Sequence, residues 1–223
     1  MEKQETNKQA IVILSGGLDS STLLYDVINQ GYNVKALSFD YGQKHRRELD
    51  CASATCKKLG IEHKILNLSV LNEVAPSALT RSDWKVPVGH YASENMKQTV
   101  VPNRNMVMLS IAAAYAMSNK ATKLFYGAHS GDHAIYPDCR EEFVEAMKNV
   151  IRIADWNPVE LKAPYSNIDK GDIVKKGIEL KVDYSLTRTC YNSGEKACGK
   201  CGSCTERLEA FAKAGITDPV PYE

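Results

Sequence analysis

Ser-Gly-Gly-Leu-Asp-Ser-Ser, residues 15–21, directly follows the apolar run Ala-Ile-Val-Ile-Leu at residues 10–14. Five consecutive apolar residues are typical of a buried parallel strand, and Gly31 ends the helix-like segment 20–30 that comes next. The Ser/Gly segment therefore lies between the end of a strand and the N-terminus of a helix. Unpaired backbone N–H groups and the positive end of the helix dipole make that position suited to a phosphate. The glycines permit close approach of the backbone, and the serines can donate hydroxyl hydrogen bonds.

This segment is not a Walker A loop, because no lysine follows its glycines. The alternative is an ordinary glycine-containing turn, but here the strand, the glycines, the serines and an Asp occur together. The segment resembles the SGGxDS signature of the N-type ATP pyrophosphatases, which split ATP to AMP and pyrophosphate while adenylating an acceptor. That resemblance implies that the phosphate is the pyrophosphate of ATP. The ATP-binding residues expected on this basis are Ile13, Leu14, Ser15, Gly16, Gly17, Leu18, Asp19, Ser20, Ser21, Thr22 and Leu23.

The composition is that of an ordinary globular protein. The 223 residues are 43% hydrophobic and 25% charged, which suits one α/β domain with a small appendage. A formal net charge of +1 gives no electrostatic attraction to nucleic acid or to an anionic membrane, so neither partner is expected. The short basic run 44–47 is interpreted as the solvated start of a helix. Residues 1–9 are polar and lack the apolar core of a signal peptide, so we expect a disordered tail there and a cytoplasmic location.

Strand-like and helix-like segments alternate along the chain, which predicts a parallel sheet covered on both faces, a Rossmann-like doubly wound α/β fold. The main domain is expected over residues 10–185, with a lid-like excursion at 72–102 that shows no clear periodicity. Residues 186–223 are expected to form a small C-terminal segment with one helix. The predicted strands are 10–14, 34–41, 63–68, 123–129 and 159–163, and the predicted helices are 20–30, 46–59, 105–118, 140–153, 170–180 and 206–214.

Four of the seven cysteines have metal-ligand spacing: Cys190, Cys198, Cys201 and Cys204 form C-x7-C-x2-C-x2-C. Four thiolates leave no open position on a tetrahedral ion, so we predict one structural Zn²⁺ per chain. A [4Fe–4S] cluster is the main alternative, but the further Cys of the bacterial run is absent, since that position is Leu208. Free thiols are the third possibility. The three other cysteines lack such spacing and are interpreted as small buried residues.

A polar loop follows the predicted strand 123–129 and should open near the phosphate site. His129, Asp132 and His133 could ligate a metal, but local hydrogen bonding within the loop is the favoured interpretation. An Asp beside the aromatic Tyr136 suits a heterocycle rich in N–H groups, because the carboxylate can accept two N–H bonds while the ring stacks. The alternative role of that residue, Asp138, is to cap the helix predicted from 140.

Two basic residues at predicted helix starts are further candidates. Arg104 either binds an anion, which would be a phosphate or a substrate carboxylate, or lies on the surface. Lys170 is at the helix end where a cation is disfavoured by the dipole, so a ligand role is the more plausible reason for it.

Taken together, these motifs resemble the QueC family of 7-cyano-7-deazaguanine synthases over residues 10–210. Tyr-Pro-Asp-Cys-Arg at 136–140, combined with the four-cysteine spacing, is the most specific part of the resemblance. Asn103 departs from it, because many members have Gly there. The other matching segments are 15–21, 39–45, 79–81, 101–105 and 189–192.

The resemblance implies that 7-carboxy-7-deazaguanine, ammonia and ATP with Mg²⁺ give the nitrile through an adenylated acid and an adenylated amide, in a homodimer. It implies catalytic roles for Asp19, Arg104 and Lys170. It also implies substrate-binding roles for Tyr136, Asp138 and Arg140. The alternatives are a tRNA sulfurtransferase, a relative that stops at the amide, and a non-catalytic nucleotide-binding module.

Overall fold

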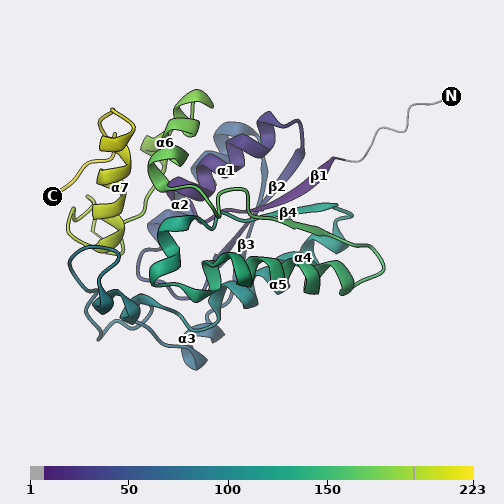
Figure 1. Cartoon of the computed structure of the whole chain (residues 1–223), viewed down its shortest axis with the longest axis horizontal. Coiled ribbons are helices and arrows are strands. Elements are labelled where there is room, and N and C mark those ends of the chain that lie inside the picture. The colour runs from purple at the N-terminus through teal and green to yellow at the C-terminus, as the bar shows by residue number, and fades with distance from the viewer. Residues whose placement is uncertain (1–7, 193) are drawn as a thin grey trace.

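Five parallel strands form one sheet in the order β3-β2-β1-β4-β5 (Figure 1). This computed structural model describes residues 8–192 and 194–223. The strands are β1 (Gln9–Ile13), β2 (Asn33–Asp40), β3 (Glu62–Asn67), β4 (Lys123–Phe125) and β5 (Glu160–Lys162). Gln9 was expected in the tail, but it pairs with Asn33 as the first residue of β1. Residues 1–7 of that predicted tail lie outside the described residues.

Helices cover both faces of the sheet. They are α1 (Leu18–Asn29), α2 (Arg47–Leu59), α3 (Val70–Val74), α4 (Arg104–Ser118), α5 (Glu141–Ile153), α6 (Lys170–Glu179) and α7 (Gly202–Lys213). Figure 1 shows α1 and α6 on one side of the sheet and α4 and α5 on the other. Alternate residues of β1 enter different cores, since Ile11 packs in the cluster with α4 and α5, whereas Ala10 and Val12 pack in the one with α1 and α6. The predicted doubly wound fold is confirmed.

Element ends differ from the prediction where a side chain or a close approach intervenes. The strand predicted over 123–129 ends at Phe125. Two residues later, a Cβ on Gly127 would lie 3.5 Å from the backbone of Ser20, so the chain passes close to the start of α1. The last helix begins at Gly202 rather than at 206, because Cys201 lies at its N-cap. Asn103 has a left-handed φ of 59° before α4, a conformation that Asn tolerates better than most residues and Gly best of all.

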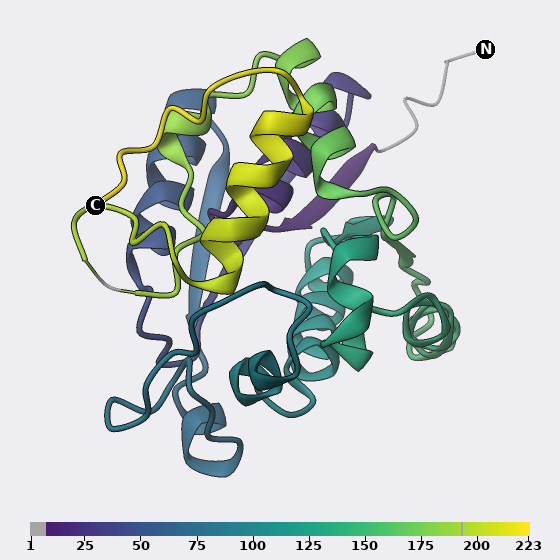
Figure 2. The same cartoon turned by 60° about the vertical axis from the view of Figure 1, so that its left-hand side comes forward.

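The excursion at 72–102 packs against the C-terminal segment. Val88 forms an antiparallel bridge with Cys201, and the Gly89 N–H donates to the carbonyl of Lys200 at 3.3 Å. Figure 2 shows this part of the chain passing across the N-terminal end of α7. Met96 is buried there. None of the described helices combines the length and the apolar character that crossing a membrane requires.

Candidate active site

A cavity of about 230 Å³ lies beyond the carboxyl ends of β1, β2 and β4, where ligands bind in doubly wound sheets. One wall comes from the Ser/Gly segment between β1 and α1. The opposite wall comes from the start of α4, the loop after β4, and the first residues of α6 and α7. Of the predicted ATP-binding residues, Ile13, Leu14, Ser15, Gly17, Asp19 and Ser20 line this cavity.

The hydroxyl groups of the loop shape its turn. Ser15 and Ser20 place their Oγ atoms 2.9 Å apart. The Ser15 N–H donates to Ser20 Oγ, and the Gly17 N–H donates to Ser15 Oγ, each at 3.1 Å. The loop therefore takes its curved form through its own side chains, beside the N-terminus of α1.

The predicted ATP-binding residues that do not line the cavity pack against the rest of the protein. Gly16 has a φ of +89°, and a Cβ there would lie 1.9 Å from the carbonyl oxygen of Glu48 in α2. Its lack of a side chain is therefore explained by helix packing as well as by backbone conformation. Leu18, Ser21, Thr22 and Leu23 are buried in the protein and do not line the cavity.

Lys170 lies between two carboxylates at the bottom of the site. Its Nζ is 2.5 Å from Glu206 Oε2 and 3.4 Å from Asp19 Oδ2. The side chains of Lys170 and Glu206 are 8% and 10% exposed. Burial alone would lower the pKa of Lys170, but Asp19 and Glu206 outweigh it and raise the pKa above the ordinary value. The structure thus directs this lysine, found at an unfavourable helix end, into the cavity as a cation.

His129 is fully buried beside the same group. Its Nδ1 accepts the N–H of Gly131 at 3.1 Å, so the proton of the neutral ring is on Nε2. That nitrogen faces Asp132 Oδ2 at 3.4 Å and Asp19 Oδ2 at 3.8 Å. The loop hydrogen bonding expected for this segment is present, together with an unpredicted contact to the phosphate loop.

Arg104 lines the cavity opposite the loop. Its Nη1 lies 3.2 Å from the hydroxyl of Tyr41, and the guanidinium lies 5.6 Å from the centre of that ring. Burial acts to lower the pKa of Arg104, but Tyr41 and Asp138 raise it further, so the side chain is a permanent cation. Arg104 therefore lies in the cavity wall rather than on the open surface, and its binding of an anion stays a prediction.

The Tyr-Pro-Asp-Cys-Arg motif contributes unevenly to the cavity. Tyr136 lines it, with its hydroxyl 2.6 Å from Thr99 Oγ1 and 3.1 Å from the hydroxyl of Tyr191. Asp138 and Arg140 do not line it. Asp138 Oδ2 accepts the backbone N–H of Asn105 in the first turn of α4, whereas the cap predicted for it was on the following helix. The Nε of Arg140 donates to the carbonyl of His133 at 2.9 Å.

Several cavity residues were missed from the sequence. His45, interpreted as part of a solvated basic run, is buried with its Nε2 3.0 Å from Glu48 Oε1. Cys139 is buried, as interpreted, but it also lines the cavity, and burial raises the pKa of its thiol. Both residues follow predicted strands, and this position in the sequence could have indicated that they lie near the site. Other lining residues that were not predicted include Phe39, Tyr41, Tyr126, Thr189, Tyr191, Ser203 and Glu206.

The four spaced cysteines converge on one point. Cys190, Cys198, Cys201 and Cys204 are all buried, and their Sγ atoms lie within 4.8 Å of one another. Within residues 8–192 and 194–223, this is the one group of three or more such side chains close enough to share an ion. The group can therefore bind a metal ion.

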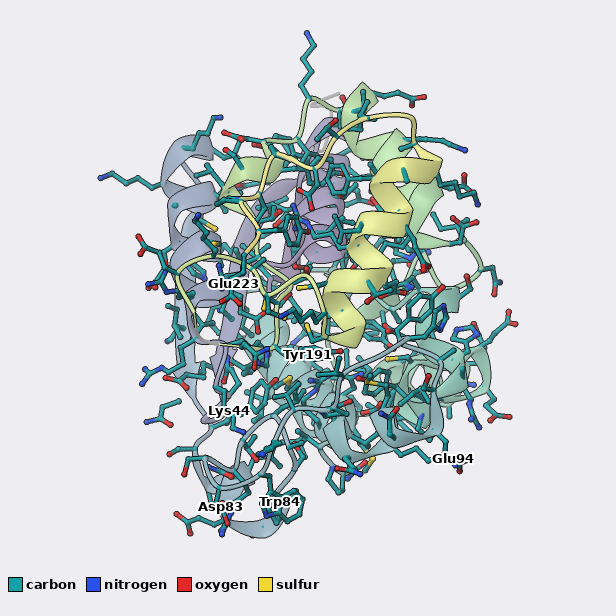
Figure 3. All side chains as sticks on the ribbon, turned by 90° about the vertical axis from the view of Figure 1, so that its left-hand side faces the viewer. Lys44, Asp83, Trp84, Glu94, Tyr191 and Glu223 are labelled. Carbon is teal, nitrogen blue, oxygen red and sulfur yellow. The ribbon has the colours of Figure 1, made fainter. Side chains whose placement is uncertain are left out.

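This cysteine group lies close to the cavity. Tyr191, next to the ligand candidate Cys190, reaches Tyr136 in the cavity wall. Figure 3 shows Tyr191 near the lower end of α7, above the part of the excursion that carries Asp83 and Trp84. Tyr191, Ser203 and Glu206 of the C-terminal segment thus form part of the cavity wall.

Comparison with known proteins identifies relatives along nearly the whole chain. The model of the family described as "Queuosine biosynthesis protein QueC" matches residues 9–215. The 7-cyano-7-deazaguanine synthase of Methanoregula boonei is 63% identical over 215 residues, which cover 96% of this chain and 99% of the relative. That of Caldicellulosiruptor saccharolyticus is 62% identical, covering 96% of each. The 7-cyano-7-deazaguanine synthase 1 of Colwellia psychrerythraea is 55% identical, covering 97% and 99%.

Solved structures share the fold at low identity. The NMN synthetase of Francisella tularensis matches 96% of this chain and 79% of its own, with a TM-score of 0.54 and 14% identity. The U34-tRNA thiolase NcsA of Methanococcus maripaludis, solved with its [4Fe–4S] cluster, matches 91% of this chain and 62% of its own, with a TM-score of 0.51 and 16% identity.

Proposed function

Because the chain belongs to the QueC family of queuosine biosynthesis proteins, we propose that it is an ATP-dependent ligase that converts 7-carboxy-7-deazaguanine and ammonia to 7-cyano-7-deazaguanine. The observation that carries the proposal is that one cavity joins the Ser/Gly loop to Arg104, Lys170 and Tyr136. A nucleotide phosphate and an acceptor bound in this cavity would be neighbours.

In the first half of the proposed reaction, the carboxylate of the substrate attacks the α-phosphate of ATP and releases pyrophosphate. The loop binds the departing pyrophosphate through its N–H groups and hydroxyls. Lys170 and Arg104 stabilise the negative charge that develops on the phosphate and on the acyl group. Ammonia then displaces AMP from the acyl-adenylate, and the product is the amide.

In the second half, a second ATP adenylates the amide oxygen. Loss of AMP and of the nitrogen-bound protons then leaves the nitrile, so each oxygen of the original acid leaves on one AMP. Tyr136 would stack on the deazaguanine in both halves, since its ring lies in the cavity wall and its hydroxyl is held by Thr99. Asp138 and Arg140 do not line the cavity, so we propose that they act on substrate binding indirectly, by holding the loop that carries Tyr136.

The residues present fit a magnesium ion accompanying ATP. Asp19 Oδ1 is buried and has no hydrogen-bond partner among the described residues. An unpartnered carboxylate oxygen beside a phosphate site is a ligand of the kind that Mg²⁺ uses. When bound, the ion would neutralise phosphate charge, and Asp19 would hold it.

For the four cysteines we propose one structural Zn²⁺ per chain. Sulfur atoms around a tetrahedral zinc at about 2.3 Å lie about 3.8 Å apart. The Sγ atoms of Cys198 and Cys204, 4.0 Å apart, support this size of site. Backbone N–H groups also point at the sulfurs, for example from Lys200 to Cys198 Sγ at 3.5 Å. A zinc–thiolate site needs reduced cysteines, so we propose a cytoplasmic location.

The remaining partners are proposals from the family. We propose that ammonia comes from solution, that the protein acts as a homodimer, and that nucleic acid does not take part. The near-zero net charge supports the last of these.

The test is a mass-spectrometric incubation of purified protein with ATP, Mg²⁺, ammonium and 7-carboxy-7-deazaguanine. The nitrile with two equivalents of AMP is the expected result, and Asp19→Asn should give neither product. Amide alone would identify a relative that stops half-way. If the acid and ATP both persist, the substrate assignment is wrong, and tRNA thiolation becomes the function to assay.

A further inference from the structure

Glu206 occupies a position that the proposed mechanism does not use. It lies in the first turns of α7, two residues after Cys204, and its side chain is 10% exposed in the wall of the ATP cavity. Its Oε2 is 2.5 Å from Lys170 Nζ. A Cβ on Gly131 would lie 2.5 Å from its Oε1, so the glycine in the opposite loop leaves room for the carboxylate in its present position.

Lys170 is shared unequally between two carboxylates. Its Nζ lies 0.9 Å nearer to Glu206 Oε2, at 2.5 Å, than to Asp19 Oδ2, at 3.4 Å. Asp19 Oδ2 faces Lys170 Nζ at 3.4 Å and His129 Nε2 at 3.8 Å, whereas its Oδ1 has no hydrogen-bond partner among the described residues. If the charge of Glu206 were absent, the buried ammonium would have Asp19 as its nearest anion and would close on it.

We propose that Glu206 is a positioning residue of the ATP site: it holds Lys170 away from Asp19 and so leaves the Asp19 carboxylate available to the divalent cation that accompanies ATP. The inference rests on the proposed function for the identity of the nucleotide. It also gives the cysteine segment a part in the active site, because the helix that begins between Cys201 and Cys204 presents Glu206 to Lys170.

The first test is equilibrium binding of Mn²⁺ in the presence of α,β-methylene-ATP, measured from the electron paramagnetic resonance signal of free Mn²⁺. Glu206→Gln should weaken Mn²⁺ binding about tenfold, since an opposite charge within 4–6 Å typically changes an ionic equilibrium by that order. The matched control is Glu209→Gln on the same helix, where the side chain is 52% exposed; it should bind Mn²⁺ as the unmodified protein does.

The second test separates positioning from structural support. In a Lys170→Met background no ammonium can close on Asp19, so adding Glu206→Gln should cause no further loss of Mn²⁺ affinity. A loss of the same size in both backgrounds would overturn the proposal, because additive effects indicate independent roles. Unchanged binding by the single variant Glu206→Gln would overturn it as well.

Three further outcomes are also decisive. If Glu206→Gln does not fold, Glu206→Asp keeps the charge one methylene further from Lys170, and weaker Mn²⁺ binding is again expected; binding equal to the unmodified protein would contradict the proposal. If the unmodified protein binds the nucleotide and Mn²⁺ but yields no nitrile, the proposed function fails while the role of Glu206 stands. If it binds neither, both are wrong.

Discussion

The carboxylate of Asp138 accepts the backbone N–H of Asn105, with 3.0 Å between Oδ2 and N, although 33 residues separate the two. The acceptor lies in the loop after β4, and the donor lies in the first turn of α4. The side chain of Asn103, at the N-cap of α4, makes no capping hydrogen bond. Asp138 therefore caps α4 instead and places negative charge at the positive end of this helix. The same turn carries Arg104.

Asp138→Ala should therefore act first on stability. Loss of a carboxylate at a helix N-terminus costs about 1 kcal/mol of unfolding free energy, which urea denaturation measures. Asp138→Asn keeps an acceptor oxygen and should recover most of that loss. If Asp138→Asn is as stable as the unmodified protein but has lost its affinity for the deazaguanine acid, Asp138 contacts substrate after all.

Arg104 should be needed for adenylation rather than for folding. Arg104→Met removes a permanent cation from the cavity wall, and loss of one such group typically costs about 10²-fold in turnover. AMP release in the presence of the acid measures this effect. Tyr41→Phe removes the hydroxyl 3.2 Å from Nη1 but keeps the ring beneath the guanidinium, so its loss should be much smaller. Equal losses in the two variants would mean that Arg104 acts only as a partner of Tyr41.

Gly16 and Gly60 offer a matched comparison of two left-handed glycines. A Cβ at Gly60 meets nothing within 4 Å, so Gly60→Ala should cost only the backbone strain of about 1–2 kcal/mol. A Cβ at Gly16 would overlap the carbonyl of Glu48, so Gly16→Ala should lose more, about 3 kcal/mol or above. Denaturation of both variants measures the difference. Equal losses would show that α2 can move away from the loop freely.

The sequence predicted the parts of this molecule that depend on neighbours along the chain. Apolar runs and glycines predicted the strand before the Ser/Gly loop and the helix that ends at residue 59, and the spacing of the four cysteines predicted that they meet. The structure has each of these features, because local backbone geometry and periodicity determine them.

The contacts missed are those between segments far apart in the chain. Glu206 is read from the sequence as an ordinary polar residue of an amphipathic helix, and His45 as part of a basic run. Both enter the cavity only because α7 and the start of α2 meet at the carboxyl edge of the sheet. Asp138 likewise precedes α5 in the sequence, but it caps α4 in the structure. Tertiary packing decides these partners.

Acid should weaken the turn that leads into the cysteine segment. Lys58, at 2.7 Å, and Ser185 hydrogen-bond Asp183 and lower its pKa below the ordinary value of 3.8. The folded state therefore favours the ionised form, and this contribution is present above pH 3.8 and lost as the pH falls through the folded-state pKa. Asp183→Asn should cost about 1 kcal/mol at pH 7, reduced by its partial exposure, and less at pH 3. Asp155→Asn on an exposed loop is the control, and a constant difference at both pH values would contradict the assignment.

Removal of the metal should unfold the C-terminal segment. The buried residues of the small core there are the four cysteines and Ala197, and only four partly buried apolar residues pack against them. Apolar packing around the cysteines therefore supplies little stability. Structural zinc sites provide about 10–16 kcal/mol of apparent binding energy in small peptides, comparable to the whole stability of a domain. A buried ion pair between Arg207 and Asp218 joins the chain after α7 to that helix. Arg207 Nη1 also donates to Thr187 Oγ1 at 2.8 Å, three residues before Cys190, but none of these contacts involves the cysteines.

Cys201→Ala should therefore yield insoluble or unfolded protein, whereas Cys51→Ser, outside the cluster, should not. Elemental analysis of the purified protein should find one zinc per chain, and a strong chelator should lower the thermal midpoint. Because α7 carries Glu206, chelation should also weaken nucleotide binding before the sheet itself unfolds. A soluble, active and metal-free Cys201→Ala protein would show that the cysteines are held by packing alone. Iron with acid-labile sulfide in place of zinc would show that the group holds a cluster instead.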